Sequence, residues 1–212
     1  MVIRNIKDDL NCTLIQSEHP HKHTEDYYIS EIYYNEEPMV IQTPVISFKK
    51  YNNTHIELLL DHSMLRGINK IDNYIINQIS DNSQEWFGSE LSIEEIRDIY
   101  KSSISFPLDE YDVASLRLNY SDKLKIYDKY NPHLELKHLE QNIPVIGLIK
   151  LNCIVFYKHT CVPQWEIISM KLKNNITNKL KSCVIADEEN ETEEDNDEKV
   201  KVIVFKENQK LF

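Results

Sequence analysis

Basic and aromatic side chains alternate along residues 123–130, near the middle of the chain. A strand directs residues i and i+2 to the same side, so one face of this segment would carry Lys123, Lys125, Tyr127 and Lys129. Arg117 and Asn119, in the preceding strand-like segment, would extend that face. Lysines that contact phosphates and a ring that stacks on a base are typical of single-stranded nucleic-acid binding. The same pattern also suits a solvated strand whose lysines protect a sheet edge.

Two further groups of residues have the types needed for metal or catalytic chemistry. His19, His21 and His23 alternate in a polar segment, and imidazole is the commonest transition-metal ligand. We favour a solvated histidine-rich loop over a metal site. The carboxylates of Asp109, Glu110 and Asp112 are close in sequence, but no second acidic motif accompanies them, as a metal-dependent nuclease would need. We therefore expect no enzyme, no bound metal and no cofactor.

The net charge of −11 is concentrated near the C-terminus. Nine of the 35 carboxylates lie within residues 187–198, which leaves 26 acidic against 24 basic residues elsewhere. The body of the protein is therefore close to neutral, and the acidity of the whole chain does not argue against nucleic-acid binding. The run itself predicts a disordered acidic segment.

Other compositional features concern the compartment and the membrane. The four cysteines (Cys12, Cys153, Cys161 and Cys183) form no C-x-x-C pair, which favours free thiols in a reducing, intracellular compartment. The N-terminus lacks the apolar core of a signal peptide, and no segment has the ~20 apolar residues of a membrane helix. Glycine clusters that would hold a phosphate are missing, since the chain has three glycines, far apart.

Most of the expected elements are strands. Residues 1–26 show no sustained period and are expected to be irregular. Strand-forming residues occupy 27–34, 39–48, 55–60, 113–120 and 123–130, and the Gln42-Thr43-Pro44 step suggests an edge strand. An amphipathic helix is expected over 69–80. A second helix begins at Ser92, where Ser92 and Glu95 match a capping box.

The largest source of core is a hairpin over residues 145–173. Its first half is almost continuously apolar, and its second half alternates, with Glu166 and Met170 on one side and Trp165 and Lys171 on the other. Residues 159–163 would connect the two strands.

Several of these segments, taken in order, resemble a viral family. They are Ile41-Gln42-Thr43-Pro44, the run Asn82-Ser83-Gln84-Glu85-Trp86-Phe87-Gly88, the capping box Ser92-Ile93-Glu94-Glu95-Ile96, and Trp165 before Ile167-Ile168-Ser169-Met170-Lys171. Together they are similar to phage T7-like single-stranded DNA-binding proteins and their relatives in nucleocytoplasmic large DNA viruses. The resemblance spans roughly residues 39–173 and depends on the order of the motifs.

The resemblance implies a mainly β (α+β) fold, an OB-fold-like antiparallel barrel with an inserted pair of helices. We expect an N-terminal extension (1–38), a single-strand-binding domain (39–181) and an acidic tail (182–212). It also implies a non-enzymatic protein of viral DNA replication, recombination or repair, in the host cytoplasm at viral factories or in the virion. The expected DNA contacts are Arg117, Lys123, Lys125, Tyr127, Lys129, Tyr130, Lys150, Phe156, Tyr157, Lys158, Lys171 and Lys173.

The same resemblance implies that the tail competes with DNA and recruits replication proteins. The tail residues concerned are Asp187, Glu188, Glu189, Glu191, Glu193, Glu194, Asp195, Asp197, Glu198 and the terminal Phe212. The chain departs from the family pattern because fourteen residues of mixed character follow Glu198. No membrane partner is expected, and a dimer is compatible with the sequence.

A second interpretation remains open at this point. The near-neutral body and the lack of a dense basic cluster also suit a virion structural protein, minor capsid or internal, that has the same barrel without DNA activity, because a fold does not determine a function.

Overall fold

The computed structural model describes residues 3–6, 10–107, 113–128 and 134–173. Residues Met1–Asn174 make up one compact unit. Its strands are β1 (Ile3–Asn5), β2 (Ile15–Ser17), β3 (His21–Lys22), β4 (Tyr28–Tyr34), β5 (Glu37–Gln42), β6 (Ile46–Tyr51), β7 (His55–Leu59), β8 (Ile104–Ser105), β9 (Ser115–Asn119), β10 (Lys125–Tyr127), β11 (Pro144–Phe156) and β12 (Cys161–Leu172). Its helices are α1 (His62–Phe87) and α2 (Ile93–Ile99), with 3-10 turns η1 (Cys12–Leu14) and η2 (Leu136–His138).

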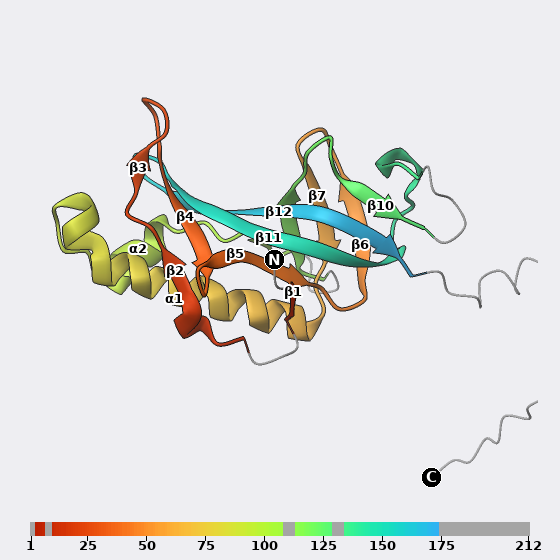
Figure 1. The fold of residues 1–212 in the computed structure, drawn as a ribbon, viewed down its shortest axis with the longest axis horizontal. Coiled ribbons are helices and arrows are strands. Elements are labelled where there is room, and N and C mark those ends of the chain that lie inside the picture. The colour runs from red at the N-terminus through yellow and green to blue at the C-terminus, as the bar shows by residue number, and fades with distance from the viewer. Residues whose placement is uncertain (1–2, 7–9, 108–112, 129–133, 174–212) are drawn as a thin grey trace, which may run out of the picture. The chain divides into compact units, whose positions relative to one another are not determined.

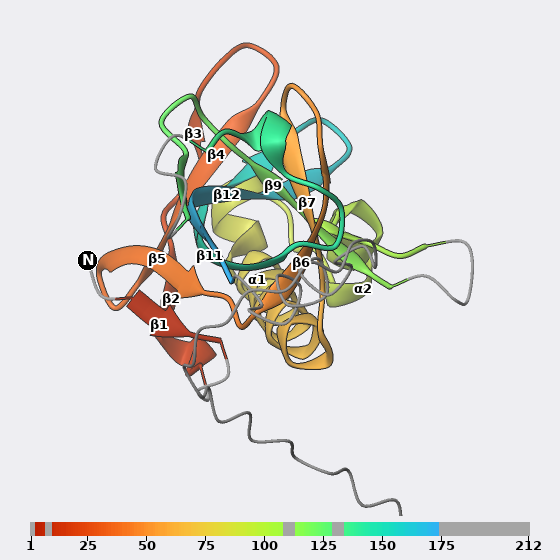
Figure 2. The same cartoon turned by 90° about the vertical axis from the view of Figure 1, so that its right-hand side faces the viewer.

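Five strands close into a barrel (Figures 1 and 2). β6 pairs with β7, β7 with β9, β9 with β12, β12 with β11, and β11 pairs again with β6. All of these pairings are antiparallel except that of β9 with β12. This is a five-stranded Greek-key barrel of the OB type. Both helices are inserted between β7 and β9, so the predicted OB-fold-like α+β barrel with an inserted pair of helices is confirmed.

The β11–β12 hairpin forms the longest part of the sheet, as expected (Figure 1). Its connection is residues 157–160, slightly earlier than predicted. The predicted alternation in β12 is wrong beyond Ile167, because the register shifts by one residue between Ile167 and Ser169. Such a bulge turns the following side chains to the other face, so Trp165, Ile167 and Met170 are all buried.

The N-terminal residues are more ordered than the sequence suggested. β1 pairs in parallel with β5, and β2 and β3 pair with β4. Ile15 is buried in the common core. Each of these strands is only two or three residues long, which is too short for a sequence pattern. Pairing with β4 or β5 therefore determines that these residues form strands.

Thr43 and Pro44 divide the single strand expected over 39–48 into β5 and β6. β5 is not an edge strand, since it pairs with both β1 and β11. At the corner, the Gly147 N–H donates to Thr43 Oγ1 at 2.8 Å, and the Thr43 N–H donates to the Gly147 carbonyl at 2.9 Å. The Thr43–Gly147 contact therefore anchors the bend to β11.

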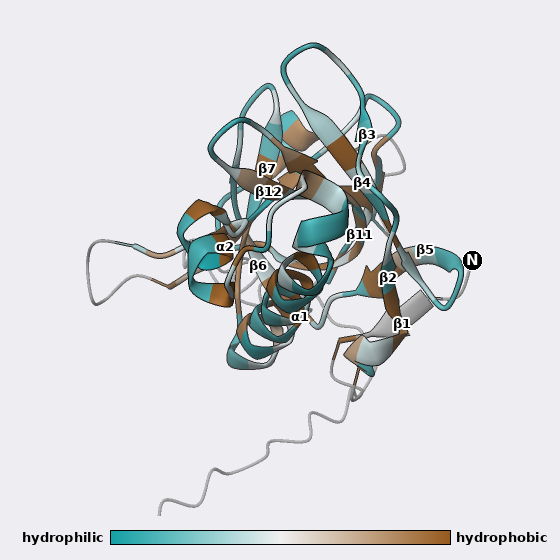
Figure 3. Ribbon diagram, turned by 90° about the vertical axis from the view of Figure 1, so that its left-hand side faces the viewer, coloured by the Kyte–Doolittle hydropathy of each residue, from teal (hydrophilic) through white to brown (hydrophobic). Residues whose placement is uncertain are grey.

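Helix α1 is longer than the predicted 69–80. It begins after Asp61, whose side chain accepts from the Met64 N–H at 2.7 Å, and it ends at Gly88, which has φ +73°. Its apolar stripe packs into the same core as the barrel strands (Figure 3). For α2 the predicted capping box is present, with the Glu95 N–H donating to Ser92 Oγ at 3.2 Å and the Ser92 N–H donating to Glu95 Oε2 at 2.9 Å.

The described cysteines Cys12, Cys153 and Cys161 are free, as predicted for them. Burial raises the pKa of Cys153 to about 11 and that of Cys161 to about 12, so both thiols stay protonated at neutral pH. Within the described ranges, no helix has the length and apolar character needed to cross a membrane.

Candidate nucleic-acid interface

The outer surface of β6, β7 and β9 carries a compact group of charged and polar side chains. Alternate residues of β7 and β9 fill the barrel: Ile56, Leu58, Leu116 and Leu118 are fully buried. The residues between them therefore point outward. In register, His55 lies opposite Asn119 and Glu57 lies opposite Arg117. We call the outward residues Lys49, Lys50, His55, Glu57, Arg117 and Asn119 the barrel face.

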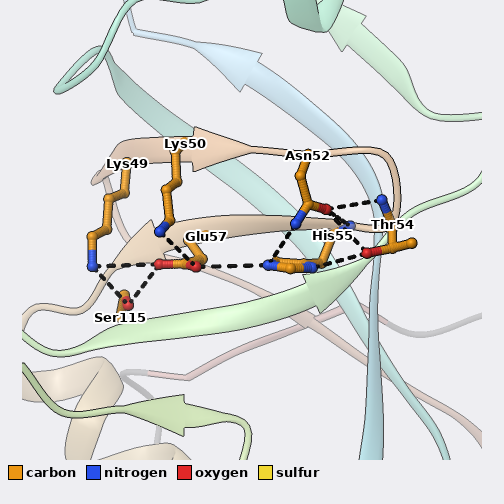
Figure 4. Close-up of polar contacts among 7 residues, drawn as sticks. All are labelled: Lys49, Lys50, Asn52, Thr54, His55, Glu57 and Ser115. Carbon is orange, nitrogen blue, oxygen red and sulfur yellow. Dashed lines mark hydrogen bonds and ion pairs between the residues drawn. The ribbon is translucent and has the colours of Figure 1, made fainter.

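A β-bulge in β6 brings two consecutive lysines to this face. Phe48 opposes Leu58 and Lys50 opposes Glu57, which leaves Lys49 as the extra residue. Lys49 Nζ lies 3.3 Å from Glu57 Oε2, and Lys50 Nζ lies 3.4 Å from Glu57 Oε1 (Figure 4). Without the bulge, neighbouring residues of β6 would point to opposite sides of the sheet.

Glu57 is the buried centre of this group. Its side chain is 6% exposed, its Oε2 accepts from Ser115 Oγ at 3.3 Å, and its Oε1 lies 3.6 Å from His55 Nε2 (Figure 4). Burial raises the pKa of the Glu57 carboxyl, but the hydrogen bond from Lys49 and the charge of Lys50 outweigh it, so the pKa is lowered. Glu57 is therefore ionised at neutral pH and holds both ammonium groups in place.

The β6–β7 turn beside the barrel face is fixed by Asn52. Asn52 Oδ1 accepts from the N–H groups of Thr54 and His55, both at 2.9 Å (Figure 4). The Tyr120 hydroxyl donates to the Asn52 carbonyl at 2.7 Å. These bonds tie the turn to the segment after β9, so the loop that borders the face is ordered.

A second basic group lies along β10 and β12. β10 runs parallel to β12, with Lys125 opposite Ser169 and Tyr127 opposite Lys171. Lys125 and Lys171 are exposed, and 53% of Tyr127 is accessible. We call Lys125, Tyr127, Lys171 and the following Lys173 the β10–β12 strip. Within the described residues 123–128 of the expected strand, Lys125–Tyr127 form β10, and Lys123 lies exposed in the turn before it.

The outer side of β12 connects the strip with the barrel face. β9 and β10 follow one another along the same edge of β12, with Asn119 opposite Glu166. Asn119 Nδ2 donates to Gln164 Oε1 at 2.7 Å. The predicted contacts Arg117, Lys125, Tyr127 and Lys171 thus belong to one side of the sheet.

The other predicted contacts differ in position and exposure. Lys150 lies opposite Glu166 and therefore on the same outer side, but it is half-buried. Phe156 is 8% exposed and packs against Trp86 and Phe87, so little of its ring is accessible. Tyr157 and Lys158 are exposed in the β11–β12 connection.

Several predicted residues fall outside the described residues. They are Lys129, Tyr130, the carboxylates Asp109, Glu110 and Asp112, the tail residues of 187–198, and Phe212.

Sequence reasoning missed Lys49, Lys50, His55 and Glu57. The adjacent lysines at the end of a strand were a usable signal, but only the bulge places both of them beside Glu57.

The histidine-rich segment is not assembled as a metal site. His21 Nδ1 lies 3.5 Å from Glu31 Oε2, and the His23 ring stacks on Tyr27. In the part of the chain that the structure describes, no three His, Cys, Asp or Glu side chains gather where they would hold a metal ion. What the outer side of the sheet offers is cations beside an exposed tyrosine, which suits a polyanion that carries aromatic bases.

Comparison with known proteins gives a matching family model and solved structures of similar fold. Residues 47–182 match the model of a family of unknown function, DUF5871. Among curated proteins, none matches the sequence.

Two solved structures are similar in fold. One is the single-stranded DNA-binding protein from bacteriophage Enc34 in complex with ssDNA, with a TM-score of 0.41, 14% identity, and coverage of 74% of this chain and 94% of that chain. The other is a C-terminal truncation of the same phage protein, with a TM-score of 0.40, 12% identity, and coverage of 76% and 94%. Similarity this distant transfers neither residues nor activity.

Proposed function

The chain belongs to DUF5871, a family of unknown function, and we propose that it binds single-stranded DNA without catalysing a reaction. The observation that carries the proposal is the run of cations on one side of the OB-type barrel, from Lys49 and Lys50 through Arg117 to Lys125 and Lys171. OB-folds bind oligonucleotides through their second and third strands, which here are β7 and β9, so the cations lie on and beside the expected strands.

The chemistry of these residues favours a single strand over a duplex. Lysine and arginine contact phosphates in either form, but a base can stack on Tyr127 only when it is unpaired. Stacking contributes about 1–3 kcal/mol per base, and each phosphate contact lowers the slope of log K against log salt by about 0.7 for a single strand. One ring and four or five cations are therefore enough for salt-sensitive binding with little sequence preference.

A finer proposal follows from the resemblance to the T7-like family. The protein would act in viral DNA replication, recombination or repair, in the host cytoplasm or in the virion, and its acidic tail would recruit replication proteins. The order of the motifs between Ile41 and Lys171 supports this role.

The decisive experiment is a fluorescence titration with labelled oligo-dT at two salt concentrations, with a blunt duplex of the same length as the control. We expect the protein to bind oligo-dT more tightly than the duplex. Its affinity for oligo-dT should fall as the salt concentration rises. No binding at low salt by protein with a normal thermal melt would rule out the proposal.

The alternative is a structural protein of the virion, and the same face offers one observation in its favour. Glu57 neutralises part of the charge of Lys49 and Lys50, and Glu166 adds a second carboxylate beside Lys150. A folded protein that ignores oligo-dT but is found in purified virions would support this alternative.

A further inference from the structure

A pocket of about 680 Å³ lies away from the β10–β12 strip, where the end of α1, the start of β4 and the β11–β12 connection meet. All of these segments lie at the left of Figure 1 and toward the viewer in Figure 3. Five aromatic side chains line the pocket: Tyr28, Trp86, Phe87, Phe156 and Tyr157. We call it the aromatic pocket.

Some of these rings form a packed floor, and others remain accessible. The Trp86 and Phe87 rings contact Phe156 edge-on, with centroid separations of 6.2 and 5.5 Å. In contrast, Tyr28 and Tyr157 are each 47% exposed and Phe87 is 39% exposed. Rings held by a helix and by one another lose little entropy on binding, so they make an efficient surface for a flat ligand.

The charges around the aromatic pocket indicate what that ligand is. Lys158, Glu25 and Asp26 are among the residues that line the pocket. A nucleotide matches this mixture, because its base stacks on rings, its N–H groups donate to carboxylates, and its phosphate attracts a lysine. The volume is also within the range of about 300–1,000 Å³ that small-ligand pockets span.

The β11–β12 hairpin links the aromatic pocket to the proposed interface. The connection between the fourth and fifth strands of an OB-fold contacts nucleic acid, and here that connection, residues 157–160, supplies Tyr157 and Lys158. β12 runs from Cys161 beside the pocket to Lys171 in the strip, roughly 33 Å at about 3.3 Å per residue. A bound strand that extends from the strip along β12 toward Cys161 would therefore reach the connection that supplies Tyr157 and Lys158.

We propose that the aromatic pocket takes an unstacked base from the single strand that the barrel binds. This inference rests on the proposed function, and it adds a second stacking site at the opposite end of β12 from Tyr127. The bound strand is then held by a ring at each end and by cations between them.

The test uses the full-length chain and a labelled oligo-dT of about 16 nucleotides, the upper end of the site sizes of single OB-folds. Tyr157→Ala removes an exposed ring in a loop, and Lys158→Glu reverses the neighbouring charge. Tyr157→Ala should weaken binding between about 5-fold and 150-fold, as the loss of one stacked base predicts. Lys158→Glu should weaken binding most clearly at low salt, because it replaces a phosphate-attracting cation with an anion. Leu14→Ala, at a residue with 38% exposure on η1, is the matched control and should bind like the wild type.

Tryptophan emission gives a second readout, which reports contact between the oligonucleotide and the pocket directly. A residue of the pocket that only supported the fold would not produce this signal. The two tryptophans are Trp86 in the pocket and Trp165, which is 1% exposed in the barrel core. Oligo-dT should quench the emission of the wild type, and Trp86→Phe should abolish the quenching while binding persists. All variants should melt like the wild type.

The outcomes separate the two proposals. If the wild type binds oligo-dT but Tyr157→Ala and Lys158→Glu bind as Leu14→Ala does, the pocket inference is wrong and the proposed function stands. If the wild type binds no oligonucleotide, the proposed function and the pocket inference are both wrong. If Trp86 emission responds to removal of residues 187–212 but not to oligo-dT, a segment of this chain occupies the pocket and the inference is overturned.

Discussion

The buried carboxylate of Glu57 lies within 3.4 Å of the ammonium groups of both Lys49 and Lys50. Because Glu57 is on the central strand of the barrel face, it orients two cations and at the same time reduces the positive potential there. A phosphate that binds at Lys50 must compete with this carboxylate. If the barrel face binds DNA as proposed, we expect Glu57 to limit the affinity.

Replacing Glu57 with Gln should therefore increase affinity for oligo-dT at low salt. If one or both lysines gain a phosphate contact, the slope of log K against log salt should steepen by about 0.7 or 1.4, respectively. Titrations at four or five salt concentrations would measure this slope. Glu94→Gln, on the exposed surface of α2, is the control and should leave the slope unchanged. An E57Q protein that is folded and has the wild-type slope would show that Lys49 and Lys50 do not contact the strand.

Charge reversal in the β10–β12 strip should have the opposite effect and lower the affinity for DNA. Lys125→Glu combined with Lys171→Glu reverses two exposed charges on either side of Tyr127, which should abolish most binding at physiological salt and leave the melting temperature nearly unchanged. Arg66→Glu with Arg97→Glu makes the same change in net charge on the helices. If both double variants lose affinity equally, net charge and not a site governs binding.

The features of this fold that the sequence predicts are those determined by neighbouring residues. The β11–β12 hairpin and the capping box at Ser92 were predictable because their signals lie within a few residues. The bulge at Lys49, the one near Ile168, and the parallel pairing of β10 with β12 depend on partner strands distant in sequence. No local pattern encodes such a register.

The candidate site shows the same division. The exposure of Lys125 and Tyr127 followed from strand alternation, whereas the burial of Phe156 follows from α1 extending to Phe87, beyond the predicted end of the helix. Glu57 was unpredictable as a centre of charge, since its apolar neighbours Ile56 and Leu58 suggested only a core strand.

Removing the residues after Ala186 should raise single-strand affinity, most clearly in low salt. The nine carboxylates of 187–198 form a dense polyanion, and its tether gives it a high effective concentration near the basic groups. Salt screens both the tail and the DNA, so the gain should shrink as ionic strength rises. Binding and thermal melting must be measured together. A truncated protein that melts normally and binds no better would make the tail a solubility segment or a docking arm.

Asp72 on α1 gives the last prediction, which concerns stability against pH. Its carboxylate accepts hydrogen bonds from the Tyr100 hydroxyl at 2.7 Å and from Ser102 Oγ at 2.6 Å, linking the helix to the segment after α2. Burial raises the pKa of Asp72 above its ordinary value of 3.8, and the two hydrogen bonds only partly offset this.

A raised folded-state pKa means that the stabilisation from Asp72 is complete below about pH 3.8 and is lost as pH rises through the folded-state pKa. Asp72→Asn cannot ionise, so its free energy of unfolding, measured by denaturant titration, should lack this decline as pH rises above about 4. Asp81→Asn, on the exposed side of the same helix, should keep the wild-type profile. If the free energy of unfolding varies with pH in the same way for the wild type and Asp72→Asn, ionisation of this carboxyl does not destabilise the folded state.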